Sequence, residues 1–139
     1  MDGLSAAASI IAVVQLAQSV GSALRDYYQD VRDARKDINA LHSPIKNLEL
    51  ILVDLETLAR REKIDLLVLQ SPTGVLNQCK SDLASLESQL ALPKNLQGRR
   101  GRFLRALKWP FQKAEVQKIV DMIERHKSAL SMYLGVQNL

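Results

Sequence analysis

The chain has 139 residues, of which 47% are hydrophobic and 24% are charged, a composition that suits one globular domain over residues 1–139. Aromatic residues make up only 4%, and glycine and proline are few, so the composition favours helices and we expect no sheet. The formal charge of +4 is modest, and the single cysteine, Cys79, excludes an internal disulfide, which favours a reducing compartment such as the cytosol.

The first element is an uncharged segment of 22 residues, Gly3 to Leu24. No basic residue precedes it, which argues against a secretory signal. A bilayer core is spanned by about 20 apolar residues, so the length suffices, although serines and glutamines dilute the segment. Its large apolar side chains lie broadly around a helix instead of in one narrow stripe, as in buried or membrane helices. These residues are Leu4, Ile10, Ile11, Val13, Val14, Leu16 and Val20.

Two interpretations of this uncharged segment stay open. The first is an ordinary core helix of the folded domain, which we expect of the resting protein. The second is a metastable helix that leaves the bundle and inserts in a lipid bilayer. Because this segment carries no charge, its insertion costs little free energy, and its many small residues would let helices pack closely in lipid.

The second element runs from about Leu24 to Arg61. Apolar residues recur there at three- and four-residue spacing, and Tyr28 falls in this row. The spacing predicts one long amphipathic helix. Pro44 lacks the backbone N–H that a helix interior needs, so we expect either a kink near Ser43 or a short break with Ser43 capping a new start.

Two further helices are predicted after this point. Ser71 and Pro72 form a helix-start signal, with Ser71 as the cap. The helix that follows ends near Pro93, and its apolar row is Leu76, Cys79, Leu83, Leu86 and Leu90.

The rest of the chain is predicted as a loop over 94–101, a short helical turn over 103–109 and a final helix over 112–134, with Gly135 as its stop. The final helix carries His126 in or beside its apolar row. The chain therefore predicts an all-α fold, a helical bundle of four principal helices plus short helical turns.

No set of residues indicates catalysis. His42 and His126 lie on separate predicted helices without a metal-binding spacing, and Cys79 sits in a leucine row, where a thiol is usually inert. Phosphate-binding, dinucleotide-binding and nucleophile-elbow motifs are lacking. We therefore expect no enzyme, no cofactor and no metal site.

A basic–aromatic patch is the other candidate site. Between Lys94 and Lys113 the sequence holds seven basic residues and no acidic one. Basic groups near an anionic leaflet contribute about 1 kcal/mol each, and tryptophan anchors at the interface. Alternatively the apolar residues of this stretch, among them Trp109 and Phe111, fold back onto the bundle while the charges stay in water, and both can hold together. Nucleic-acid binding ranks third, because the patch is short and lacks a motif. The patch consists of Arg99, Arg100, Arg102, Arg105, Lys108 and Trp109.

Two stretches carry a resemblance to a known family. The opening MDGLSAAASIIAVVQLAQSV and the later ALKWPFQKAEVQKIVDMIERHKSAL resemble the HeLo-like N-terminal domain of fungal NLR-type (STAND) immune receptors and related cell-death proteins. The resemblance covers essentially the whole chain, but the region from Leu41 to Gln97 matches only in pattern. It implies an effector bundle at the N-terminal part of a longer protein, followed by a nucleotide-binding oligomerisation module or an amyloid-forming motif.

The resemblance also implies a function. In such proteins oligomerisation exposes the N-terminal helix, which permeabilises the membrane. We therefore expect a cytoplasmic cell-death effector that self-associates on activation, moves to the plasma membrane and binds anionic lipids. Its other partners would be downstream domains of the same chain or an NLR partner. The alternative is a soluble helical adaptor for protein–protein or homotypic interaction, with no membrane step.

Overall fold

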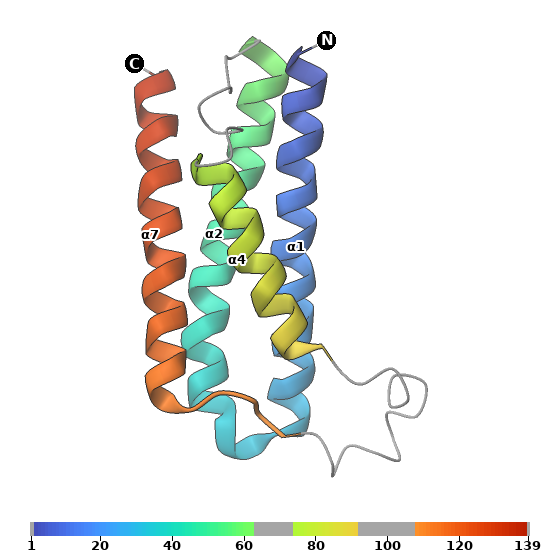
Figure 1. Cartoon of the computed structure of the whole chain (residues 1–139), viewed down its shortest axis with the longest axis vertical. Coiled ribbons are helices and arrows are strands. Elements are labelled where there is room, and N and C mark those ends of the chain that lie inside the picture. Colours follow the sequence, from blue (N-terminus) through green and yellow to red (C-terminus); the bar gives the residue numbers. More distant parts are fainter. Residues whose placement is uncertain (1, 63–73, 92–107, 139) are drawn as a thin grey trace.

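The computed structural model describes residues 2–62, 74–91 and 108–138. Those ranges hold four α-helices, one short 3₁₀-helix and no strand. The predicted all-α bundle is thereby confirmed, and its three longest helices run along one axis while the shortest α-helix crosses them obliquely (Figure 1). In chain order the elements are α1 (Asp2–Asp30), η1 (Arg32–Ala34), α2 (Arg35–Glu62), α4 (Val75–Leu90) and α7 (Lys113–Asn138).

The turn between α1 and α2 lies further along the chain than predicted. α1 continues to Asp30, so the expectation of a second helix from Leu24 is wrong. The helix ends where Val31 takes φ −121° and ψ 90°. Arg35 holds the turn, because its Nε donates a 2.8 Å hydrogen bond to the Tyr28 carbonyl and satisfies one of the acceptors that a helix end leaves free. α1 and α2 thus form an antiparallel pair (Figure 1).

α2 is one helix across Pro44. The predicted break, with Ser43 capping a new start, is therefore absent. Proline in a helix interior costs about 3 kcal/mol. The residues around it offset this cost, because Leu41, Ile45 and Leu48 are all fully buried. Tertiary packing along this face keeps the helix continuous where local preference disfavours it.

The buried face of α1 is a single stripe. Its members recur at three- and four-residue spacing, and they face α2 and α4, on which α1 packs. Small alanines complete this row, and the large apolar residues spread beyond it as predicted, because Ile11 and Leu16 are half-buried beside it. Tyr27, not Tyr28, ends the row. The stripe consists of Ala7, Ile10, Val13, Val14, Ala17, Val20, Leu24 and Tyr27.

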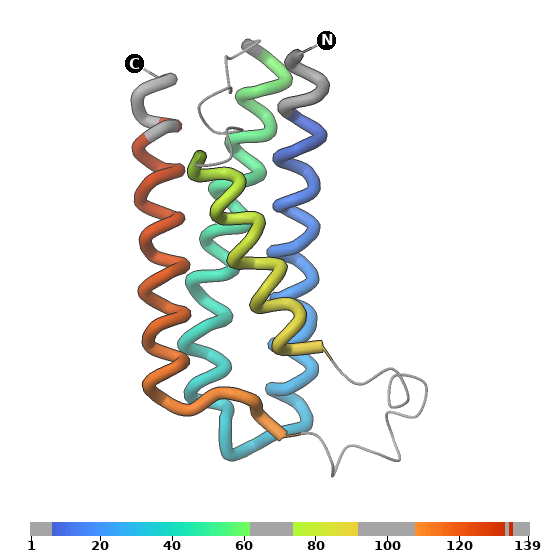
Figure 2. Tube along the Cα trace, viewed as in Figure 1, coloured from blue at the N-terminus to red at the C-terminus, as the bar shows by residue number. Residues whose placement is uncertain are grey.

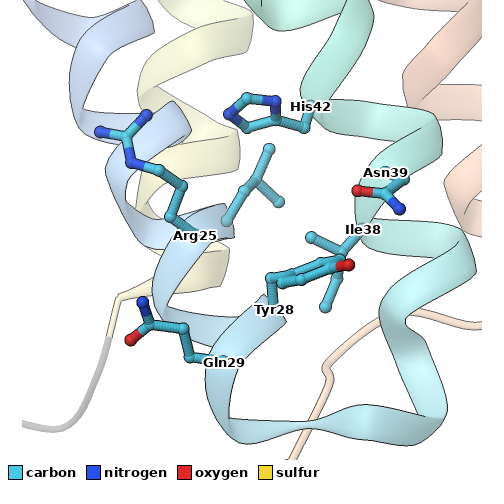
Figure 3. Close-up of a pocket in the computed structure, with 7 residues that line it drawn as sticks. Arg25, Tyr28, Gln29, Ile38, Asn39 and His42 are labelled. Atoms are coloured by element: carbon cyan, nitrogen blue, oxygen red, sulfur yellow. The ribbon is translucent and has the colours of Figure 1, made fainter.

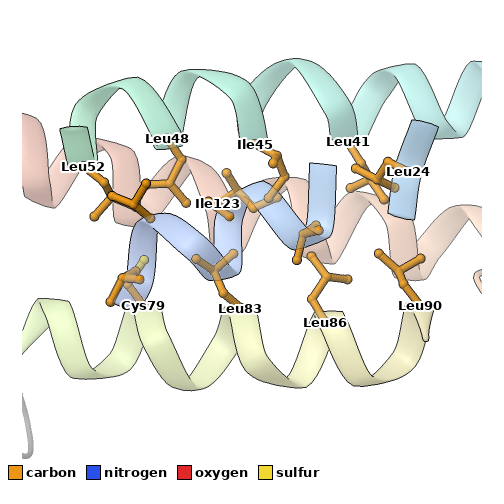
Figure 4. Close-up of a cluster of buried hydrophobic side chains, with 14 of the residues drawn as sticks. Leu24, Leu41, Ile45, Leu48, Leu52, Cys79, Leu83, Leu86, Leu90 and Ile123 are labelled. Carbon is orange, nitrogen blue, oxygen red and sulfur yellow. The ribbon is translucent and has the colours of Figure 1, made fainter. Parts of the chain in front are cut away.

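α4 confirms the predicted apolar row in full, since all five of its members are buried (Figure 4). Its start differs from the prediction, because Gly74 is the N-cap, with φ −72° and ψ 158°. Ser71 is therefore not its cap, and Ser71 and Pro72 lie outside the described residues. The predicted helical turn also falls mostly outside them, and Lys108 and Trp109 at its end are not helical.

α7 packs mainly on α2. Val116, Ile123 and Leu130 recur every seven residues along it and are buried. The helix continues past Gly135 to Asn138, so the predicted stop was wrong. A glycine inside a helix costs only about 1 kcal/mol, which is too little to end it. Before α7, the segment from Lys108 crosses the end of the bundle from the side of α1 (Figure 2).

Candidate functional site

α1 carries the residues predicted for membrane insertion, and the structure divides them. Ile10, Val13 and Val20 are fully buried and Val14 is 8% exposed, so these four pack in the core. Ile11 and Leu16 are half-buried beside the stripe. Leu4 lies in α1, and its side chain is outside the described residues. In this conformation the apolar bulk of the helix is directed into the bundle.

From Ala8 to Ser22 the opposite face of α1 is polar but carries no charge. Its exposed residues are alanine, serine and glutamine, and the first charge after the uncharged segment is Arg25. Within the stretch from Ala7 to Asp30, an 18-residue window with a mean hydropathy of 1.6 makes the helix long and apolar enough to cross a membrane by length and composition, and 44% of that window is buried in the bundle. Core helices of soluble proteins pass the same test. The exposed residues before Arg25 are Ala8, Ser9, Gln15, Gln18, Ser19 and Ser22.

An aromatic clasp holds the C-terminal end of α1; it consists of Tyr27, Trp109 and Phe111. The Trp109 ring centroid lies 5.3 Å from that of Tyr27 and 5.2 Å from that of Phe111, both in edge-to-face geometry. The Tyr27 hydroxyl donates a 3.2 Å hydrogen bond to the Leu90 carbonyl at the end of α4. Burial raises the pKa of this hydroxyl above 10.0. The clasp therefore joins α1, α4 and the segment that leads into α7.

The basic–aromatic patch is only partly within the described residues. Trp109 packs against the bundle, as in the alternative in which the rings fold back, and Lys108 beside it is exposed. At this point of the chain the ring lies inward and the charge outward. The four arginines of the patch, Arg99, Arg100, Arg102 and Arg105, lie outside the described residues.

The two histidines and the cysteine stand on three different helices: His42 on α2, Cys79 on α4 and His126 on α7. His126 is buried and its Nε2 lies 2.7 Å from Asp82 Oδ2, which links α7 to α4. Burial, and then the charge of Asp82, raises the pKa of the Cys79 thiol to about 12, so it is protonated at neutral pH. In the described part of the chain no three metal-ligating side chains come together.

A cleft lies between α1 and α2, near their joined ends (Figure 3). Its volume is about 290 Å³. The pKa of His42 at this cleft is lowered by partial burial and, after that, by the charges of Arg25 and Lys46. Sequence analysis missed this site, because it gave Leu24 and Tyr28 to the wrong helix. The lining residues are Leu24, Arg25, Tyr28, Gln29, Ile38, Asn39 and His42.

Comparison with known families gives a match that covers the whole chain. A family model described as "Pigment biosynthesis cluster protein PigL N-terminal" matches residues 1–139. No curated protein and no solved structure matches the chain. The matched range includes all the described helices and the segments that join them.

Proposed function

The chain belongs to the pigment biosynthesis cluster protein PigL N-terminal family, and for this member we propose a membrane-targeting effector domain. We propose that the bundle is HeLo-like and that clustering of several copies releases α1 into the membrane, which it permeabilises. In a cell this activity would cause programmed death. The observation that carries the proposal is the uncharged segment of the first helix, up to Leu24, which has a core face and an outer face without charge.

The dimensions of α1 support insertion. The uncharged segment Gly3 to Leu24 has 22 residues, which in a helix span about 33 Å and match a hydrocarbon core of about 30 Å. Arg25 and Asp26 follow directly, where charged groups would lie at the lipid–water interface. Insertion therefore buries no ionised side chain, and charges at mid-membrane are the costly ones.

The chemistry of the sequence outside α1 supports recruitment to membranes. The patch from Arg99 to Lys108 provides five basic residues without an acidic neighbour, and each would contribute about 1 kcal/mol near an anionic leaflet. We propose that the resting domain is cytoplasmic and moves to the plasma membrane on activation. Its partners would be further copies of itself, anionic lipids, and downstream domains or an NLR partner that brings the copies together.

The experiment is dye release from phosphatidylglycerol vesicles with a chemically clustered fusion of the domain. Gln15→Glu with Gln18→Glu places two charges on the exposed face of α1, where the folded bundle is not disturbed. At mid-membrane each acidic side chain costs about 2.5–3.5 kcal/mol, so release should fall at least about tenfold.

The matched control is Gln78→Glu with Gln89→Glu, the same change at two exposed positions of α4. We expect this variant to release dye like the wild type. Circular dichroism checks that both variants fold. Equal release from the α1 variant and the α4 control would contradict insertion of α1.

A soluble adaptor is the second candidate, and one observation favours it. The stripe of α1 is also the ordinary buried row of a core helix, which needs no membrane step. In that case the clustered wild type releases no dye, and the α1 variant retains the self-association and cellular location of the wild type.

A further inference from the structure

The cleft between α1 and α2 has an apolar floor. Leu24 and Ile38 form it and are buried. The Tyr28 ring, which is 37% exposed, stands at the wall, and the Arg35 guanidinium carbon stacks 4.7 Å from its centroid. A volume of about 290 Å³ lies just below the range for small-molecule pockets, which is about 300–1,000 Å³. The floor therefore suits a short apolar group.

The rim of the same cleft is cationic and rich in hydrogen-bond donors. Arg25 from α1 and His42 from α2 stand on its two sides (Figure 3). Arg25 is exposed and makes no ion pair with another described residue. The side-chain amides of Gln29 and Asn39 complete the rim. A guanidinium that forms no ion pair with a described acidic residue, beside neutral donors, is an arrangement that recognises a carboxylate or a phosphate.

We propose that this cleft binds an amphiphilic anion, with its carboxylate or phosphate on Arg25 and His42 and its apolar group on the floor. A free fatty-acid-type molecule and a lipid headgroup in a bilayer share this chemistry. The inference stands apart from the insertion of α1, because it concerns the bundle with α1 in place.

The charge around His42 adds a pH dependence. The pKa of His42 is lowered by burial and by Arg25 and Lys46, while Glu49 acts in the opposite direction. A bound anion favours the protonated ring, so the complex takes up a proton as it forms. Binding should therefore tighten as the pH falls from about 7.5 to about 5.5, through the ordinary range of histidine.

The position of the cleft couples binding to stability. Its walls come from two helices, so a ligand that binds only the packed pair stabilises the folded bundle. At ten times its Kd, a ligand should raise Tm by about 3–8 °C.

Octanoate is the probe, and calorimetric titration of the whole chain measures its binding. We expect Arg25→Gln to weaken binding about tenfold or more, and Arg125→Gln, the same change at an exposed site of α7, to leave it unchanged. His42→Gln should remove the pH dependence. Equal binding by Arg25→Gln and Arg125→Gln, or binding of octan-1-ol as tight as that of octanoate, would overturn the proposal.

Vesicles distinguish the two sources of the anion. Sedimentation with phosphatidic acid vesicles, compared with phosphatidylcholine vesicles, measures lipid binding of the same variants. A loss of lipid binding in Arg25→Gln but not in Arg125→Gln assigns the cleft to a lipid headgroup. Unchanged lipid binding, with weakened octanoate binding, assigns it to a free amphiphile. Both results support the proposal, and the absence of any Arg25 effect with either probe refutes it.

Discussion

Truncation of the tryptophan in the aromatic clasp should destabilise the bundle substantially. Trp109→Ala removes two edge-to-face contacts, with Tyr27 and with Phe111, each worth about 0.5–1.5 kcal/mol beyond burial. The half-buried ring also loses its transfer free energy, which adds about 1–2 kcal/mol. We expect the free energy of unfolding to fall by about 2–4 kcal/mol, within the range of large-to-small substitutions.

Trp109→Phe separates ring contacts from the indole N–H. The Trp109 Nε1 atom is buried and has no hydrogen-bond partner among the described residues. An unpaired buried donor costs about 1–3 kcal/mol, and phenylalanine removes that cost while keeping a ring in the clasp. The loss should therefore stay below about 1 kcal/mol.

Urea unfolding followed by circular dichroism is the suitable assay, because Trp109 is the single tryptophan and its fluorescence is lost in both variants. Met132→Ala, at a side chain that is 72% exposed, is the control and should change stability by less than about 0.5 kcal/mol. A Trp109→Phe variant as unstable as Trp109→Ala, or a Trp109→Ala variant as stable as the control, would refute the reasoning.

Three other residues give shorter predictions. The pKa of the Cys79 thiol is about 12 in the fold and 9.0 for an unperturbed thiol. The free energy of unfolding is therefore unaffected by this group below pH 9, and it falls by about 1.4 kcal/mol per pH unit between these two pKa values. In alkaline unfolding, Cys79→Ala should flatten this slope. Leu83→Ala should cost about 2–5 kcal/mol in urea unfolding and Leu50→Ala, at a 53% exposed side chain, less than about 0.5. Asp82→Ala leaves the buried His126 ring without its partner and should lower the free energy of unfolding by about 1–3 kcal/mol. A loss of the same size in Asp82→Asn would show that the hydrogen bond is not the cause.

The fold class and the core row of α4 were predictable from the sequence. In α4 the five buried positions are large or sulfur-containing apolar residues at helical spacing, with polar residues and one alanine between them, so the pattern alone identifies the face. The end of α1 was not predictable in this way. The row through Leu24 and Val31 continues at helical spacing, and no glycine or proline marks the turn near Val31. Periodicity reports a face, and only tertiary contacts such as that of Arg35 with Tyr28 fix where the chain reverses.

The candidate sites show the same limit. A shift of one position turns a side chain by about 100° around a helix, so misplacing the turn exchanged Tyr27 for Tyr28 in the buried row. The clasp also joins Tyr27 to Trp109 and Phe111, which are far from it in sequence. The cleft needs the register of α1 against α2, which no local pattern contains. The uncharged segment from Gly3 to Leu24, by contrast, is a property of the sequence itself and was recognised directly.

The packing of α1 explains why the proposed release needs several copies. Five of its large aliphatic residues are buried, and at about 1.5–3 kcal/mol each their burial is comparable to the whole stability of a small domain. In a bilayer α1 recovers this burial free energy, because hydrocarbon also removes its side chains from water. The faces of α2 and α4 that pack on α1, where Leu48 and Leu83 are fully buried, do not recover their burial free energy when α1 enters the bilayer. In a cluster those faces can pack against neighbouring copies. The free energy of release therefore depends on self-association, and a lone domain should keep α1 in place.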